Sequence, residues 1–148
     1  MQPDSLTIVL PAFNEEARLG PALDELFGYL ARHGARGRDG APGAAALPAD
    51  IQVLVVDDGS TDGTATLVRA RPEAIAPDGT RRPPLVLISV PHGGKGAAVR
   101  AGMLAADTDL VLFADADDRA AAVTRGFHLW RGFTGRSEPP RAWTDARA

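Results

Sequence analysis

The sequence predicts an α/β domain whose mostly parallel sheet carries helices on both faces. Four short apolar runs alternate with segments that have helical periodicity or helix-starting signals. Each run is apolar throughout, which is typical of strands buried on both faces of a parallel sheet. A polar cluster follows each run, and the carboxyl ends of such strands are where these folds bind ligands. The fold class therefore directs attention to one edge of the sheet.

Length and composition set limits before any motif is considered. The chain has 148 residues, 45% hydrophobic and 24% charged, which is ordinary for one globular domain. It contains no cysteine, which excludes a disulfide framework and a thiolate metal site. The formal charge of −3, with no basic patch interleaved with aromatic residues in the first two thirds, argues against nucleic-acid binding. With no signal-peptide pattern and no apolar run of the ~20 residues that span a membrane, we expect a cytoplasmic protein.

The first strand and helix are expected within the first 32 residues. Residues 6–10 form a short apolar run, rich in β-branched residues, that Pro11 should stop. Asn14 can cap the next helix, with Glu15 and Glu16 in its first turn, where the helix dipole favours acids. Its apolar face repeats at helical spacing as Leu19, Leu23, Leu26, Phe27 and Leu30. Residues 33–50 are rich in Gly, Ala and Pro, and predict a flexible surface insertion.

The remaining elements continue the alternation of strands and helices. They are a strand over 51–56, a helix from Thr61 or Asp62 to about Arg71, a surface loop over 72–84, a strand over 85–90, a helix over about 97–106 and a strand over 109–114. Each strand is short and continuously apolar, and the alternation with helices indicates a parallel sheet covered on both faces.

Asp115 and Asp117 follow the fourth strand, one residue apart. Alternate side chains of a strand share a face, so both carboxylates should point the same way. Two hard oxygen ligands suit Mg²⁺ or Mn²⁺ carrying a diphosphate. A polar loop after a buried strand explains the pair equally well when it is taken alone. Because the other polar clusters fall at the same edge, we favour the metal–nucleotide interpretation.

The polar residues after the first two strands also have simpler explanations. The turn from Pro11 to Glu15 can lay backbone groups and a carboxylate against a base or ribose, but a plain helix cap accounts for it locally. Asp57 and Asp58 precede a glycine turn, where an acid can accept hydrogen bonds from a nucleobase or ribose. Two acids exceed what a cap requires. We therefore assign a functional role to Asp57 and leave Asp58 open.

A glycine-rich turn, residues 92–96, precedes the third helix. It fails the Walker pattern because Gly96, not Ser or Thr, follows Lys95. Glycines before a helix can nevertheless offer backbone N–H groups to an anion. Lys95 is the only lysine among 16 basic residues, so we prefer an anion-binding role to a flexible turn with a solvated lysine. His92 is interpreted as a loop histidine, not a ligand.

Four segments together resemble the family 2 glycosyltransferases, enzymes of GT-A fold that use nucleotide-diphosphate sugars. The segments are 9–16 (VLPAFNEE), 55–64 (VVDDGSTDGT), 94–102 (GKGAAVRAG) and 113–117 (FADAD). The resemblance covers about residues 5–118. It is greatest to the dolichyl-phosphate glucosyltransferase branch, with the polyprenyl-phosphate mannosyltransferases as neighbours, and it implies a Rossmann-like GT-A sheet.

The resemblance also implies a donor site and a reaction. The site would comprise a nucleoside pocket lined by Pro11, Ala12, Phe13 and Glu15, a base contact from Asp57, Lys95 near the base or diphosphate, and a catalytic DxD motif of Asp115 and Asp117 that binds Mg²⁺ or Mn²⁺. The implied reaction is metal-dependent, inverting transfer of a hexose to a polyprenyl or dolichyl phosphate. UDP-glucose is favoured as the donor and GDP-mannose is next. A lipid acceptor would place the protein at the inner membrane surface, as a peripheral protein.

Residues 119–148 differ in character from the rest of the chain. Residues 1–118 hold 10 basic and 17 acidic side chains, a net charge of −7, whereas 119–148 hold 6 and 2, a net charge of +4. The later segment sustains neither strand nor helix periodicity. We therefore expect 1–118 to be the nucleotide-sugar-binding half of a GT-A domain, incomplete at its C-terminal end. On this hypothesis a truncation or frame shift made 119–148 a basic tail that is not native to the fold, and the downstream coding DNA should continue the family pattern in another frame.

Two other classes of protein fit parts of the sequence. A non-catalytic nucleotide-sugar-binding remnant would bind nucleotide and metal without turnover. A Mg²⁺-dependent phosphoryl-transfer domain would become phosphorylated on aspartate and ignore nucleotide sugars. The second class leaves the Asn14–Glu15 turn and the glycines beside Lys95 unexplained.

Overall fold

The computed structural model of the protein describes residues 5–34, 48, 50–76, 83–114 and 130–131. Strands and helices alternate along them as the sequence predicts. The elements are β1 (Ser5–Ala12), α1 (Leu19–Gly34), β2 (Asp50–Asp57), α2 (Thr64–Arg69), a short 3₁₀ turn η2 (Pro72–Ala74), β3 (Leu85–Ser89), α3 (Lys95–Ala105), β4 (Leu110–Phe113) and β5 (Trp130–Arg131).

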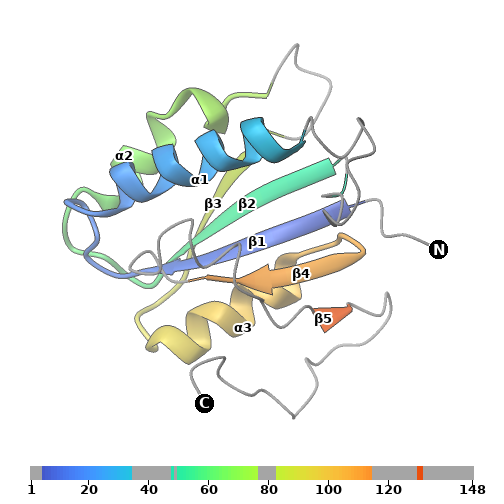
Figure 1. Ribbon diagram of the computed structural model, residues 1–148. Helices are drawn as coiled ribbons and strands as arrows, with labels where there is room; N and C mark the ends of the chain where they lie inside the picture. The colour runs from blue at the N-terminus through green and yellow to red at the C-terminus, as the bar shows by residue number, and fades with distance from the viewer. Residues whose placement is uncertain (1–4, 35–47, 49, 77–82, 115–129, 132–148) are drawn as a thin grey trace, which may run out of the picture.

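The described strands form one sheet in the order β3-β2-β1-β4-β5. β1 to β4 are parallel, and only β5 runs antiparallel, beside β4. From β1 the chain moves outward through β2 to β3, then crosses to the opposite side of β1 and adds β4 there (Figure 1). The strand order thus changes direction between β1 and β4. In open α/β sheets such a switch point, at the carboxyl ends of the strands, is where ligands bind.

Helices cover both faces of the sheet, which confirms the predicted fold class. α1 and α2 lie on one face and α3 on the other (Figure 1). Successive residues of β1 serve the two faces in turn, because alternate strand side chains point in opposite directions. Ile8 and Leu10 pack in the core beneath α1, whereas Val9 packs beneath α3. The predicted apolar stripe of α1 is also confirmed, since Leu19 and Leu23 are fully buried.

α3 packs closely against the sheet at Gly102. A Cβ atom built on this glycine would lie 2.9 Å from Cγ2 of Val56 and closer still to Cγ1 of Val9. Real Cβ contacts of that length do not occur, so only glycine lets the helix backbone approach the sheet this closely. Because α3 follows β3 along the chain, its amino end, with Lys95, lies at the carboxyl edge of the sheet.

Two local predictions at the start of the chain are wrong. Pro11 does not stop β1 but lies inside it, opposite Val56 of β2. The peptide of Val9 faces β4, since its carbonyl accepts the Ala114 N–H, and two residues on, Pro11 faces the same way. Because the β1–β4 pairing ends at Val9 and Phe113, the missing N–H of Pro11 removes no bond of the ladder.

Asn14 does not cap α1, which begins at Leu19. A turn intervenes, in which the Glu15 carbonyl accepts the N–H groups of Arg18 and Leu19. Asn14 instead has a positive φ of 50° and contacts the turn after β2. Local spacing cannot distinguish a cap from such a long-range contact, because the same side chain serves both.

Other boundaries differ by a few residues. α2 starts at Thr64 and not at Thr61 or Asp62, η2 occupies the start of the predicted 72–84 loop, and α3 starts at Lys95. The predicted 33–50 insertion lies almost wholly outside the described residues. So does the predicted 119–148 tail except β5, and its origin stays a prediction. Among the described helices, none has the combination of length and apolar character needed to cross a bilayer.

Candidate functional site

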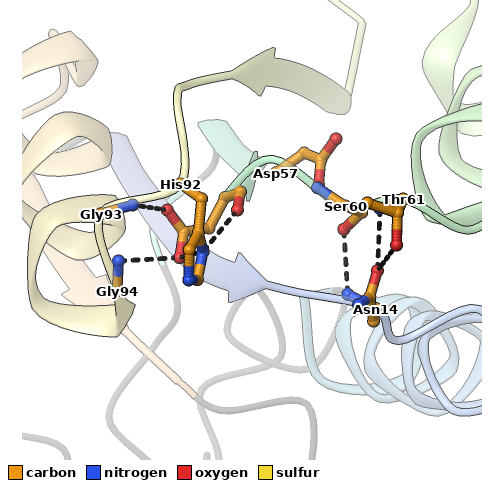
Figure 2. A network of polar contacts seen from close by, with 8 residues as sticks. Asn14, Asp57, Ser60, Thr61, His92, Gly93 and Gly94 are labelled. Carbon is orange, nitrogen blue, oxygen red and sulfur yellow. Dashed lines mark hydrogen bonds and ion pairs between the residues drawn. The ribbon is translucent and has the colours of Figure 1, made fainter.

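The turns after β1, β2 and β3 meet at the carboxyl edge of the sheet (Figure 2). Asn14 joins the first two turns. Its backbone N–H donates to Oγ of Ser60 at 2.9 Å, and its Oδ1 accepts the N–H of Thr61 at 2.9 Å. Asn tolerates the left-handed backbone better than other non-glycine residues, so it can hold this conformation while its side chain makes the bond.

The two glutamates after Asn14 extend the same junction. The Glu15 N–H donates to Oγ1 of Thr64 at 3.0 Å, and the Glu16 carboxylate accepts the Gly63 N–H at 3.2 Å. The Glu15 carboxylate pairs with Nε of Arg18 at 2.9 Å. The nucleoside pocket predicted from Pro11, Ala12 and Glu15 stays a prediction. Pro11 and Ala12 are both buried in β1.

Asp57 ends β2 and is 5% exposed. Its Oδ1 accepts the Ser60 N–H at 3.0 Å, an Asx-type turn that shapes the loop after the strand. Its carbonyl accepts the Val90 N–H at 2.9 Å and so ties the end of β3 to β2. The predicted base contact of Asp57 stays a prediction.

Asp58 has a role that the sequence left open. Its Oδ1 accepts the Gly93 N–H at 2.8 Å and its Oδ2 accepts the Gly94 N–H at 3.0 Å. The expectation that these glycine N–H groups are offered to an outside anion is therefore wrong, because a buried carboxylate of the same chain already accepts them. A second acid beyond the needs of a cap was the sequence signal for this contact.

His92 and Phe13 form a stacked pair beside this turn. Their ring centroids are 4.3 Å apart with 25° between the planes. Nδ1 of His92 lies 3.0 Å from Oδ2 of Asp58 and 3.1 Å from its carbonyl oxygen. Phe13 remains 42% exposed, so part of its ring is open to solvent. The sequence predicts Phe13 as part of the nucleoside pocket, whereas His92, against which it packs, is interpreted only as a loop histidine.

Lys95 is the first residue of α3 and is exposed. It follows Gly94, whose φ of 93° and ψ of 169° are essentially restricted to glycine. The location of the lysine at the carboxyl edge of the sheet is as the sequence predicts. Its role toward a base or diphosphate stays a prediction.

Asp115 and Asp117 lie outside the described residues, which end at Ala114 in this part of the chain. The Ala114 N–H donates to the Val9 carbonyl at 2.9 Å, so β4 reaches the switch point beside β1. Within the described ranges, no cluster of three or more His, Cys, Asp or Glu side chains could hold a metal ion. The role of Asp115 and Asp117 as the DxD pair that binds Mg²⁺ or Mn²⁺ stays a prediction.

The sheet order, the helices on both faces and the polar carboxyl edge agree with the GT-A class of glycosyltransferases, to which the similar solved structures belong. A mannosyltransferase of Pyrobaculum calidifontis, solved with GDP-Man and Mn²⁺, has a similar fold at a TM-score of 0.52 and 26% sequence identity. The similarity covers 79% of this chain and 28% of that one. The sequence also matches the family described as Glycosyl transferase family 2 over residues 7–122. This protein belongs to that family.

Curated relatives agree with the predicted branch. The chain is 38% identical over 112 residues to a dolichyl-phosphate beta-glucosyltransferase of Drosophila melanogaster, covering 76% of this chain and 30% of the relative. The human dolichyl-phosphate beta-glucosyltransferase is 35% identical over 112 residues, covering 76% and 31%. The chain thus spans about a third of the length of these relatives. Membership of the family argues against the phosphoryl-transfer alternative.

Proposed function

We propose that this protein binds a nucleotide-diphosphate sugar at the switch point between β1 and β4, and that it transfers the hexose to a polyprenyl or dolichyl phosphate. The observation that carries the proposal is the topology. Three polar turns and the end of β4 meet where an open α/β sheet has its crevice. The described residues there lie within residues 7–122, the range that matches the family.

The donor contacts proposed for the described residues follow from their places at this edge. The half-exposed ring of Phe13 can pack against a nucleoside, and Asp57, at the carboxyl end of β2, can accept from a base. Lys95, at the start of α3, supplies positive charge for a diphosphate. Pro11, Ala12 and Glu15 complete the proposed pocket.

Asp115 and Asp117 would hold Mg²⁺ or Mn²⁺, and their carboxylate oxygens are donors that suit either ion. Such a metal, when bound, stabilises negative charge on the departing nucleoside diphosphate. Mn²⁺ in the similar mannosyltransferase supports the proposal. Ala114, the last described residue before the motif, is bonded to Val9 of β1 at the edge where the other turns meet, which supports this proposal.

The proposed transfer is a direct displacement with inversion at the anomeric carbon. The acceptor phosphate oxygen forms the new bond as the bond to the nucleoside diphosphate breaks. A lipid phosphate is already anionic at neutral pH, so the acceptor needs no strong general base. The names of the curated relatives favour a glucosyl donor and a dolichyl-type acceptor, which we propose as UDP-glucose and a polyprenyl phosphate at a membrane surface.

Thermal unfolding with nucleotide tests the donor site. The purified chain is heated with UDP, GDP or neither, each with and without Mn²⁺. A nucleotide at about a hundred times its dissociation constant should stabilise the folded state by ~2.7 kcal/mol. For a domain of this size that corresponds to a rise in Tm of about 5 to 10 °C. The rise should need Mn²⁺ and disappear in Asp115→Ala.

Transfer is then measured with UDP-glucose and GDP-mannose on a polyprenyl phosphate. Nucleotide binding with no turnover would favour the non-catalytic remnant over the enzyme. A cooperative transition that no nucleotide shifts would contradict the donor site itself.

A further inference from the structure

We propose that Thr64 is a positioning residue of the donor site, whose buried hydroxyl sets the place of Glu15 without touching the nucleotide. Thr64 is the first residue of α2, and Glu15 lies in the turn after β1. The inference rests on the proposed function, in which Glu15 lines the nucleoside pocket and Thr64 has no assigned role. Its basis is a hydrogen bond that joins the turns after β1 and β2.

The Thr64 hydroxyl lies between a carboxylate and a backbone N–H. Thr64 is 0% exposed, its Oγ1 accepts the Glu15 N–H at 3.0 Å, and the same hydroxyl donates to Oδ1 of Asp62. These directions follow because an ionised carboxylate has no proton to give and an N–H can only donate. A charged acceptor makes a strong bond, so Asp62 holds the hydroxyl with its lone pairs toward Glu15.

The neighbouring bonds between the two turns are more open to water. The bonds donated by the N–H groups of Asn14 and Glu16 are exposed, so water can replace their acceptors. Thr64 is enclosed, and removing its hydroxyl would leave the Glu15 N–H without this acceptor. The Thr64 bond therefore holds Glu15 more firmly than the exposed bonds hold the residues on either side.

The other contacts of Glu15 stay within its own turn. Its carbonyl accepts the N–H groups of Arg18 and Leu19, where α1 begins, and its carboxylate lies 2.9 Å from Nε of Arg18. The Glu15 side chain is 16% exposed, so it has little freedom once its backbone is fixed. The bond to Thr64, in contrast, reaches the turn after β2. It thus sets Glu15 in relation to the β2 side of the proposed pocket.

Thr64→Val tests the hydroxyl, because valine has nearly the same shape and no O–H group. UDP and GDP are each titrated with Mn²⁺ by calorimetry into the wild type and the variant. We expect the nucleotide that the wild type binds to bind Thr64→Val about tenfold more weakly, because binding must then also order the turn. Thr64→Ser keeps the hydroxyl, so its affinity should lie within about twofold of the wild type.

Two further variants make the titration decisive. Thr64→Ala removes the same hydroxyl with a smaller side chain, and it takes the place of Thr64→Val if urea denaturation shows no folded valine variant. Thr7→Val is the matched control. Thr7 is also 0% exposed, and its Oγ1 lies 2.7 Å from Oγ1 of Thr108, near the start of β1 and away from the carboxyl edge. Thr7→Val should lower the stability and leave the nucleotide affinity within about twofold of the wild type.

Amide NMR reads the surroundings of Glu15 directly. The Glu15 N–H signal should move upfield in Thr64→Val, because the N–H loses its acceptor. The same signal should keep nearly its wild-type position in Thr64→Ser and in Thr7→Val, since both variants retain the Thr64 oxygen or its serine equivalent.

The outcomes keep the two proposals apart. A wild type that binds neither nucleotide overturns the proposed function and this inference with it. A wild type that binds, with Thr64→Val binding equally well, overturns the positioning role alone. So does a loss of affinity that Thr64→Ser fails to restore, a loss of the same size in Thr7→Val, or a loss without a shift of the Glu15 N–H signal.

Discussion

At the scale of single residues, the junction between the first two turns depends on short polar side chains that each hold backbone N–H groups. Asn14 accepts from Thr61, and Asp62 accepts from Glu16 at 3.3 Å and from Thr64 at 3.0 Å. Each bond joins or shapes loops that have no strand partner of their own. The loops at the predicted site are therefore held by side chains, while the sheet beneath is held by its backbone ladder.

Asp62 gives a prediction about pH. The hydrogen bond from the Thr64 hydroxyl, with backbone N–H bonds, lowers the pKa of Asp62 below its ordinary value of 3.8. Folding therefore favours the ionised form, and its contribution is complete above pH 3.8 and lost as the pH falls through the lower, folded-state pKa. We expect Asp62→Asn to be less stable than the wild type at pH 7, by a difference that shrinks below pH 3.8. Urea denaturation at about pH 7, 4 and 3 measures it.

A constant difference between the two proteins across that range would contradict the role of the Asp62 charge. Asp62 is exposed, so the effect belongs to its hydrogen bonds and not to burial.

At the scale of elements, the contact between α3 and the sheet is controlled by one glycine. Val9 and Val56 occupy the space that a side chain on residue 102 would need. A helix held this near the sheet also holds the turn in front of it. The position of Lys95 is therefore a property of how the whole of α3 packs.

We predict that Gly102→Ala destabilises the protein by about 1 to 3 kcal/mol, because the added methyl group must push α3 away from β1 and β2. Gly96→Ala is the control in the same helix. Apart from its chain neighbours and the backbone of α3 itself, no heavy atom lies within 4 Å of where that methyl group would be, and alanine favours the helix over glycine. Guanidinium denaturation of both variants measures the free energy of unfolding, and equal stabilities would contradict the close packing.

At the scale of the whole molecule, β1 is the centre of the fold. It pairs with β2 on one side and β4 on the other, and its residues contribute to the cores beneath both helical layers. β3, in contrast, is at the edge of the sheet. The first strand of the chain therefore pairs directly with two later strands, β2 and β4, and packs against both helical layers.

Replacing one isoleucine in the central strand β1 and one in the edge strand β3 tests this arrangement. Ile8 of β1 is 1% exposed, and Ile8→Ala should cost about 2 to 5 kcal/mol. Ile88 of β3 is only partly buried, and Ile88→Ala should cost less, about 1 kcal/mol. Denaturant unfolding compares the two, and a larger loss at the edge strand would mean that β1 is not the centre of stability.

The family and the fold class could be predicted because both depend on local sequence patterns. Apolar runs such as residues 51–56 identify strands by their own composition, and the stripe from Leu19 to Leu30 identifies a helix face by its spacing. The strand ends then give the edge where polar residues gather. Predictions that are wrong, such as the Asn14 cap, concern side chains that can form a hydrogen bond with either a near or a distant partner.

The sequence by itself determined the alternation of strands and helices, the family, and which acids and which lysine fall at the carboxyl ends of the strands. Only the tertiary structure decided which of those polar groups meet. Asp58 lies 35 residues from Gly93, and Asn14 lies 47 from Thr61. No local pattern encodes which of these distant residues come into contact, because the contacts depend on the order in which parallel strands join the sheet. That order, with β1 between β2 and β4, brings the turns together into the candidate site.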